Sequence, residues 1–199
     1  IRRCFRYAES EALGVEKPET VERMEKILKK IGANLEERAV VGQARQAAWE
    51  AKNKGKGHQG VYCGAAIELR DGRIITGKNS PLLHAESAVL LNALKTLVGL
   101  PDDLDLLSNE AVSSIGRMKK DVFSEYSESL NLDQTLVALA ISVQFNPSAK
   151  NAMKALIKLQ GCEMHITHLP TVGDQEGLRK LKLNVTTDAL PFGKLFRID

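Results

Sequence analysis

The stretch VYCGAAIELRDGRIITG, residues 61–77, decides the fold of this chain. Its centre, Asp71-Gly72, separates two runs rich in apolar and β-branched residues, and this dipeptide in that setting is among the strongest short-range signals for a β-hairpin. A loop, Lys78–Pro81, follows, and then a helix expected from about His84 to Val98. Because that helix is apolar on most of its surface, it must be buried. The sequence predicts a hairpin covered by a buried helix.

The C-terminal part of the chain adds more strands and helices. Residues 161–168 and 183–187 read as strands around a short helix near 174–181, and strand, helix, strand in so few residues predicts a parallel crossover. Residues 132–143 and 147–159 carry apolar residues at helical spacing. The predicted class is therefore α/β, with an antiparallel hairpin and a parallel crossover in one mixed sheet, and helices on both faces in three layers.

The N-terminal region has a different pattern. Pro18 stands at a good first helical position, Gly32 follows as a stop, and a second helix is expected over about 35–52. The connector 52–58 has three lysines among glycines and no apolar residue, which is typical of a flexible linker. Because the chain opens inside a helical pattern, we expect residues 1–58 to be the tail of an upstream domain and 59–199 to be the α/β domain. An acidic, serine-rich insertion with one short helix, lid-like, is expected at about 101–129.

Composition excludes several classes of protein. With 199 residues, 43% of them hydrophobic, and a net charge of +3, the chain can build a core and is not intrinsically disordered. No apolar run is long enough to cross a bilayer and no signal segment opens the chain, which predicts a soluble, cytoplasmic protein without a membrane partner. The small net charge gives no indication of nucleic-acid binding. Cys4, Cys63 and Cys162 are too scattered for a disulfide framework or a thiolate zinc site.

The triplet His84-Ala85-Glu86 is the first candidate site. An imidazole and a carboxylate on the first turn of a helix are what a zinc-dependent nucleobase deaminase uses to hold its metal and move a proton. The local text GAAIELRDGRIITGKNSPLLHAESAVLLNAL, residues 64–94, resembles that superfamily. The second half of its signature, P-C-x-x-C, is absent, and Ser148 and Asn151 stand where its cysteines would be. The alternative is a purely structural role, with His84 capping the helix and Glu86 exposed to solvent.

Two further candidates lie near the C terminus. His165 and His168 are three apart on a predicted strand and point to opposite faces, so they cannot chelate one ion unless the strand ends between them. His168 at the carboxyl end of a parallel strand is a candidate ligand-binding residue, and His165 a buried one. In the following loop, Asp174 as N-cap and Glu176 in the first turn favour capping over anion binding.

Read end to end, the chain resembles the C-terminal part of an uncharacterised bacterial family, domain of unknown function 1846. The resemblance rests on IRRCFRYA at residues 1–8, GVYCGAAIELRDGRIITGKNSPLLHA at 60–85, and GCEMHITHLPTVGDQEGLRKLKLNVTTD at 161–188. It implies a longer cytosolic protein whose N-terminal part carries a glycine-rich, phosphate-loop-like segment that this chain does not contain. It implies no established activity.

Two classes of function stay open. In the first, the domain is a ligand-binding or assembly module that partners the upstream nucleotide-binding part or another copy of itself. In the second, His84 and Glu86 serve a metal-assisted hydrolase or deaminase-like enzyme acting on a nucleotide-like small molecule. In both, we expect Asn79, Gly64 and Ala65 of the hairpin region to face one pocket with His84 and Glu86, and His168 to help bind the ligand. The sequence indicates no particular metal, cofactor or substrate.

Overall fold

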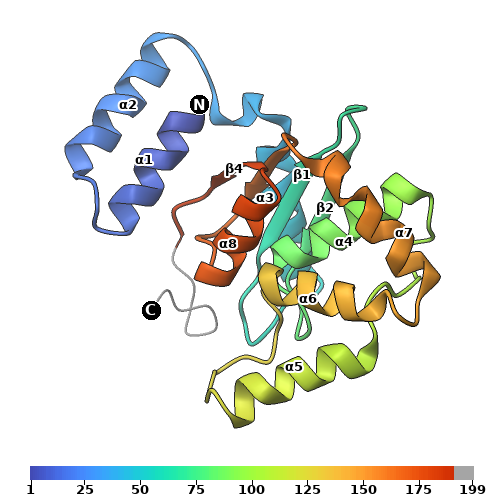
Figure 1. The fold of residues 1–199 in the computed structure, drawn as a ribbon. Helices are drawn as coiled ribbons and strands as arrows, with labels where there is room; N and C mark the ends of the chain where they lie inside the picture. The colour runs from blue at the N-terminus through green and yellow to red at the C-terminus, as the bar shows by residue number, and fades with distance from the viewer. Residues whose placement is uncertain (191–199) are drawn as a thin grey trace.

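The computed structural model describes residues 1–190, and a four-stranded mixed sheet forms its centre (Figure 1). The strands are β1 (Gly64–Glu68), β2 (Ile74–Lys78), β3 (Glu163–Ile166) and β4 (Asn184–Thr187), in the spatial order β2-β1-β3-β4. β1 pairs antiparallel with both β2 and β3, whereas β3 and β4 are parallel. The predicted hairpin and parallel crossover are both confirmed.

Helices cover both faces of this sheet. α3 (Ala39–Asn53) contacts β1, β2 and β3 on one face, while α4 (Ala85–Val98) contacts β1 and β2 on the other. α7 (Pro147–Ala155) packs beside α4 and adds its buried alanines to the same core. The predicted class, α/β with a helical layer on each side of a mixed sheet, is therefore confirmed.

The remaining helices surround these layers. α1 (Arg2–Ala12) and α2 (Pro18–Lys30) form a helical hairpin at one end of the molecule, and α5 (Asn109–Asp121) lies at another side (Figure 1). α6 (Leu132–Ser142) packs against α7 and against α8 (Val172–Lys180). Short 3-10 turns occupy Leu35–Glu37 and Leu156–Leu159. No helix in residues 1–190 has the length and apolar character needed to span a membrane.

The helix predicted over 35–52 begins later than expected. A 3-10 turn comes first, and Arg38 then adopts an extended backbone before α3 starts at Ala39. The reason is tertiary: the Arg38 side chain pairs with Glu163 and donates to the Met164 carbonyl at 3.0 Å, so it ties the start of α3 to β3. The strand predicted over 161–168 is also shorter, because a turn at Gly161 with φ +76° precedes it.

The face between α3 and β1 depends on a glycine. A Cβ at Gly64 would lie 2.2 Å from the Ala44 carbonyl oxygen and 2.6 Å from the Ala48 backbone nitrogen, closer than real atoms approach. The missing side chain therefore lets α3 rest directly on the sheet. Gly42, on the same helix, has nothing within 4 Å of its position for a Cβ.

An ion-pair cluster joins α3 to the end of β4. Arg45 donates to Asp188 from Nη2 at 2.7 Å and from Nε at 3.1 Å, and His165 Nε2 lies 3.4 Å from the same carboxylate. Burial raises the pKa of Asp188, but the hydrogen bonds and charges of His165 and Arg45 outweigh it and lower that pKa to about 2. The ring of Phe5 in α1 packs on His165 with centroids 4.8 Å apart.

We expect Gly64→Ala to destabilise the protein by about 1–3 kcal/mol, because the added methyl group forces α3 away from β1. Gly42→Ala is the matched control in the helix that Gly64 contacts. It has open space and a helical backbone, so it should stabilise by about 0.5–1 kcal/mol. Urea unfolding of both variants measures the difference, and equal effects would contradict the close approach.

We expect Asp188→Asn to destabilise the protein at neutral pH by about 1–2 kcal/mol, a value discounted for partial solvent screening. Because the folded pKa of Asp188 lies below its ordinary value of 3.8, its stabilising effect is present above pH 4 and is lost as pH falls towards 2. The difference in unfolding free energy between wild type and variant should therefore shrink over that range. A difference that is constant from pH 6 to 2 would refute the assignment.

Candidate functional site

Three helices begin at one place, and the Asp174 carboxylate joins them. Its Oδ1 accepts a hydrogen bond from the backbone N–H of Leu132, the first residue of α6, at 2.7 Å. Its Oδ2 accepts from the Thr171 hydroxyl at 2.5 Å and lies 2.8 Å from Nδ1 of His84, the residue that precedes α4. Asp174 itself is in α8 and has no exposed surface. One buried carboxylate thus links the starts of α4, α6 and α8.

The prediction that Asp174 is the N-cap of α8 is wrong. The cap is Thr171, whose hydroxyl accepts from the Asp174 N–H, while the Asp174 side chain accepts from the Thr171 N–H in a reciprocal capping box. Asp174 is also the acidic residue of the first turn. This placement one turn later is what directs its carboxylate towards His84.

Electrostatics keep this carboxylate ionised. Burial raises the pKa of Asp174, but the neighbouring His84 and the hydrogen bonds from Thr171 and Leu132 lower it more strongly. The net pKa of Asp174 is below its ordinary value. Lys119 of α5 adds a positive charge to the same region and is itself buried, donating to the Ser129 carbonyl. Burial lowers the pKa of Lys119, although Glu125 partly opposes that change.

A second buried pair lies beside the first. His168 Nε2 is 2.9 Å from Oε1 of Glu86, and both side chains are almost completely buried. Burial lowers the pKa of His168, but Glu86 and Cys63 raise it more strongly, to about 10. His168 is therefore an imidazolium at neutral pH, and it lies against the Glu86 carboxyl group.

The two pairs come together as one cluster. One ligand atom each from His84, Glu86 and Asp174 lies within 4.8 Å of the other two. Among the described side chains, neither oxygen of Glu86 accepts a well-aligned hydrogen bond, even though the residue has 0% exposure. A buried carboxylate ordinarily has several donors. This donor set of one imidazole and two carboxylates suits a divalent metal such as zinc.

The structure brings together three of the residues predicted from sequence, His84, Glu86 and His168. The Asn79 side chain instead fixes the entry to β1, because it accepts from the Cys63 N–H at 2.8 Å and donates to the Val61 carbonyl at 3.0 Å. At Gly64, the position that a side chain would occupy faces α3, against the Ala44 carbonyl. Ala65 is buried in the core on the α4 face.

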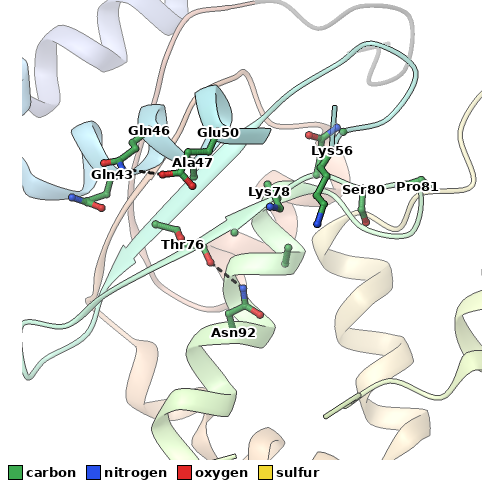
Figure 2. Close-up of a pocket in the computed structure, with 14 residues that line it drawn as sticks. Gln43, Gln46, Ala47, Glu50, Lys56, Thr76, Lys78, Ser80, Pro81 and Asn92 are labelled. Atoms are coloured by element: carbon green, nitrogen blue, oxygen red, sulfur yellow. Dashed lines mark hydrogen bonds between the residues drawn. The ribbon is translucent and has the colours of Figure 1, made fainter. Parts of the chain in front are cut away.

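A cavity of about 610 Å³ lies beside β2, and Asn79 is part of its wall (Figure 2). His84, Glu86, Gly64 and Ala65 are not among the residues that line it. The five residues expected to face one pocket are thus divided among a buried cluster, a helix–sheet contact, the core and a cavity wall.

The histidines of β3 and the loop after it separate as predicted. β3 ends at Ile166, so His165 faces the α3 side, where it meets Asp188 and Thr186, while His168 turns towards Glu86 on the α4 side. α7 lies beside α4, and residues 132–142 are helical, as their apolar spacing predicts. The groups that meet His84 come, however, from α8 and from Leu130 before α6. The likeness to deaminases stays a prediction.

The predicted insertion contributes to the closure of the cluster. It contains one helix, α5, as expected, and its end, residues 127–130, lies against the start of α4. The His84 N–H donates to the Leu130 carbonyl at 3.0 Å, and the Ser129 hydroxyl donates to the Ser80 carbonyl at 3.1 Å. These contacts cover His84 and leave it 4% exposed.

Sequence reasoning missed the roles of Asp174, Cys63 and Lys119. For Asp174 a signal existed: Thr171 and Asp174 have the spacing of a capping box, and a capping carboxylate at that position is free to accept further hydrogen bonds. Nothing local marks Cys63 or Lys119, since each acts on a residue from a distant segment, Cys63 on His168 and Lys119 on Asp174.

Comparison with known proteins places this architecture in a family. A family model described as "Domain of unknown function DUF1846, C-terminal" matches residues 36–193. A UPF0371 protein of Clostridium botulinum (strain Eklund 17B) is 36% identical over 189 residues, and one of Corynebacterium aurimucosum is 37% identical over 188. A UPF0371 protein of Streptococcus thermophilus is 38% identical over 182 residues.

These relatives are considerably longer than the chain. The alignments cover 94%, 94% and 90% of this chain but only 37%, 36% and 35% of the Clostridium, Corynebacterium and Streptococcus proteins. The chain thus spans little more than a third of the curated relatives that it matches. Because the family model matches residues 36–193, the chain belongs to the family described as domain of unknown function DUF1846, C-terminal.

Proposed function

We propose that this chain is the metal-binding C-terminal module of a larger protein, with His84, Glu86 and Asp174 as the ligands of a divalent transition-metal ion. The observation that carries the proposal is Glu86, a fully buried carboxylate with no well-aligned donor among the described residues. His168 Nε2, 2.9 Å from Oε1, supplies one neighbouring positive charge, and a metal ion would supply the bonds that the carboxylate otherwise lacks.

The chemistry of the donor set supports zinc in particular. Zinc takes imidazole nitrogen and carboxylate oxygen at about 2.0–2.2 Å, so its ligand atoms stand roughly 3–4 Å apart. The cluster's spread of up to 4.8 Å is close to that separation and needs only small side-chain movements. His168, held as a cation against Glu86, and Thr171, bonded to Asp174, would orient the two carboxylates.

Burial favours a structural centre over a catalytic one. Catalytic zinc sites keep a position open to water, whereas structural sites are closed by protein. His84 is 4% exposed, and Glu86 and Asp174 have no exposure. The metal-assisted hydrolase or deaminase-like alternative needs an opening beside His84, where residues 127–130 now lie. We therefore favour a binding or assembly module over an enzyme.

The rest of the protein completes this proposal. The relatives are longer than the chain, which agrees with a module that works beside another domain. We propose, from the resemblance stated above, that the upstream part binds a nucleotide, that the protein is cytosolic, and that the module partners this upstream part or a second copy of the chain.

The metal proposal predicts about one equivalent of zinc in freshly purified protein, measured by elemental analysis. Glu86→Gln keeps the size of the side chain but removes the ligand charge, so the zinc content should fall at least tenfold. Glu176→Gln is the matched control, because Glu176 lies partly exposed in α8, close in sequence to Asp174, and it should retain the metal.

Two results would overturn the proposal. One is protein that contains no transition metal and gains no thermal stability when zinc is added. The other is a zinc content that survives Glu86→Gln but is lost in a cysteine variant, which would assign the metal to another donor set.

The hub formed by Asp174 generates a separate prediction about stability. Asp174→Asn leaves His84 and the Thr171 hydroxyl without their charged acceptor, so the unfolding free energy should fall by about 3 kcal/mol. Asp133→Asn, which removes only a surface pair with Lys180, should cost less than about 0.5 kcal/mol. Chemical denaturation with the metal removed by chelation separates this effect from loss of the ion. Similar effects of the two variants would show that Asp174 does not join the helices.

A further inference from the structure

A second feature, independent of the buried cluster, is the cavity beside the free edge of β2. It lies between α3 and α4, with the end of β2 and the following loop between them (Figure 2). Its volume of about 610 Å³ is in the range of small-molecule sites, which are about 300–1,000 Å³. Most of the groups that line it are polar, among them Gln43, Gln46, Asn92 and Ser80.

Two positive charges gather at one end of this cavity. Lys56 and Lys78 lie near each other beside Ser80, while Gln43, Gln46 and Glu50 are on the α3 side (Figure 2). Within residues 1–190, neither lysine forms an ion pair or a side-chain hydrogen bond, in contrast to Glu50, which is paired with Lys54. Two ammonium groups without an ion-pair partner attract an anion, because Glu50, the carboxylate that also lines the cavity, is engaged with Gln46 and Lys54.

The strand edge adds a backbone donor at the same place. Gly64 exchanges hydrogen bonds with Thr167 on its β3 side, so its partner Lys78 directs its own N–H and carbonyl away from β1. The Ser80 oxygen accepts from the backbone N–H groups of Leu82 and Leu83, which leaves its hydroxyl proton to be donated. A compact anion at this end would meet two ammonium groups, one amide and one hydroxyl.

The position of Lys56 is built into the fold. In the segment predicted as a flexible connector, residues 52–58, the chain folds back on itself: the Lys56 N–H donates to the Ala51 carbonyl at 2.8 Å, and His58 bridges to Val61. Gly57 allows this path, because a Cβ there would collide with the Val61 carbonyl and the Tyr62 ring. This backbone path places Lys56 in the wall of the cavity.

The same edge is poorly suited to the addition of a peptide strand. The Asn92 side chain donates to the Thr76 carbonyl at 2.9 Å and so uses the acceptor that a docking strand would need at the middle of β2. A lysine on an edge strand also discourages pairing with another strand. These features favour a small ligand.

We propose that this cavity binds a small polar molecule through a phosphate group, held by Lys56, Lys78, the Lys78 N–H and Ser80. A phosphate monoester carries about two negative charges at neutral pH, which matches the two lysines. The amides of Gln43, Gln46 and Asn92 face the rest of the cavity, where they suit a hydroxyl- or amide-bearing remainder. The site shares no residue with the buried cluster, so it does not depend on the metal.

The test is isothermal titration calorimetry of the whole protein with inorganic phosphate and with glycerol 3-phosphate, with acetate as the carboxylate arm and sodium chloride at matched ionic strength. We expect both phosphates to bind and glycerol 3-phosphate to bind more tightly, because it also reaches the amide side chains. Lys56→Gln and Lys78→Gln should each weaken binding about five- to tenfold. Lys52→Gln is the matched control: the residue is exposed at the start of the same connector but does not line the cavity, so the variant's affinity should equal that of wild type.

Several outcomes would overturn the proposal. Equal loss in the Lys52 variant would mean non-specific attraction to a basic surface, and unchanged affinity in the Lys56 and Lys78 variants would move the site elsewhere. Acetate binding as strongly as phosphate would replace the phosphate by a carboxylate ligand. An extended acidic peptide that binds while phosphate does not would replace the proposal by strand addition at β2. Far-UV circular dichroism of each variant checks that the fold is intact.

Discussion

The arrangement of this molecule depends on the buried carboxylate of Asp174. An ionised group without solvent is tolerated only when charges and hydrogen bonds surround it, and here they come from His84, Thr171 and the first amide of α6. Because these partners belong to three helix starts, the need to satisfy one carboxylate fixes where α4, α6 and α8 begin relative to one another. The close contact between α6 and α8 follows, with Gly173 and Gly177 against Asn131 and Leu132.

Each face of the sheet carries partly or fully buried carboxylates that lie beside basic side chains. On the α3 face, Asp188 is balanced by Arg45, lies against His165, and keeps some contact with solvent. On the α4 face, Glu86 and Asp174 are fully enclosed and lie against His168 and His84 respectively. The first arrangement is a conventional ion pair between a helix and a strand end. The second concentrates ligand-type atoms in a closed space, which is why it is the candidate metal centre.

The buried cluster and the cavity are separate parts of one neighbourhood. Asn79 and Ser80 connect them. The Asn79 side chain accepts a hydrogen bond from the Cys63 N–H, and the Ser80 hydroxyl accepts one from the N–H of Leu83, the residue before His84. The same loop therefore sets the position of the cluster and forms one wall of the cavity. On the cavity side, β2 has no neighbouring strand because it is the outer strand of the sheet. The Asn92 amide donates a hydrogen bond to one β2 carbonyl, that of Thr76.

Sequence alone determined the local elements and much of the fold. The Asp71-Gly72 turn, the apolar helix after His84 and the short strand-helix-strand unit each carry their signal in a short segment, so they predict the mixed sheet and its helical layers. The sequence also indicated that His84 and Glu86 lie close together, because both stand at the start of one helix. The tertiary structure alone decided what meets them, because Asp174 is 90 positions away from His84. It also decided that Gly64 faces α3 and that Lys56 and Lys78 line the same cavity, since the orientation of a strand and the path of a connector depend on packing between distant segments.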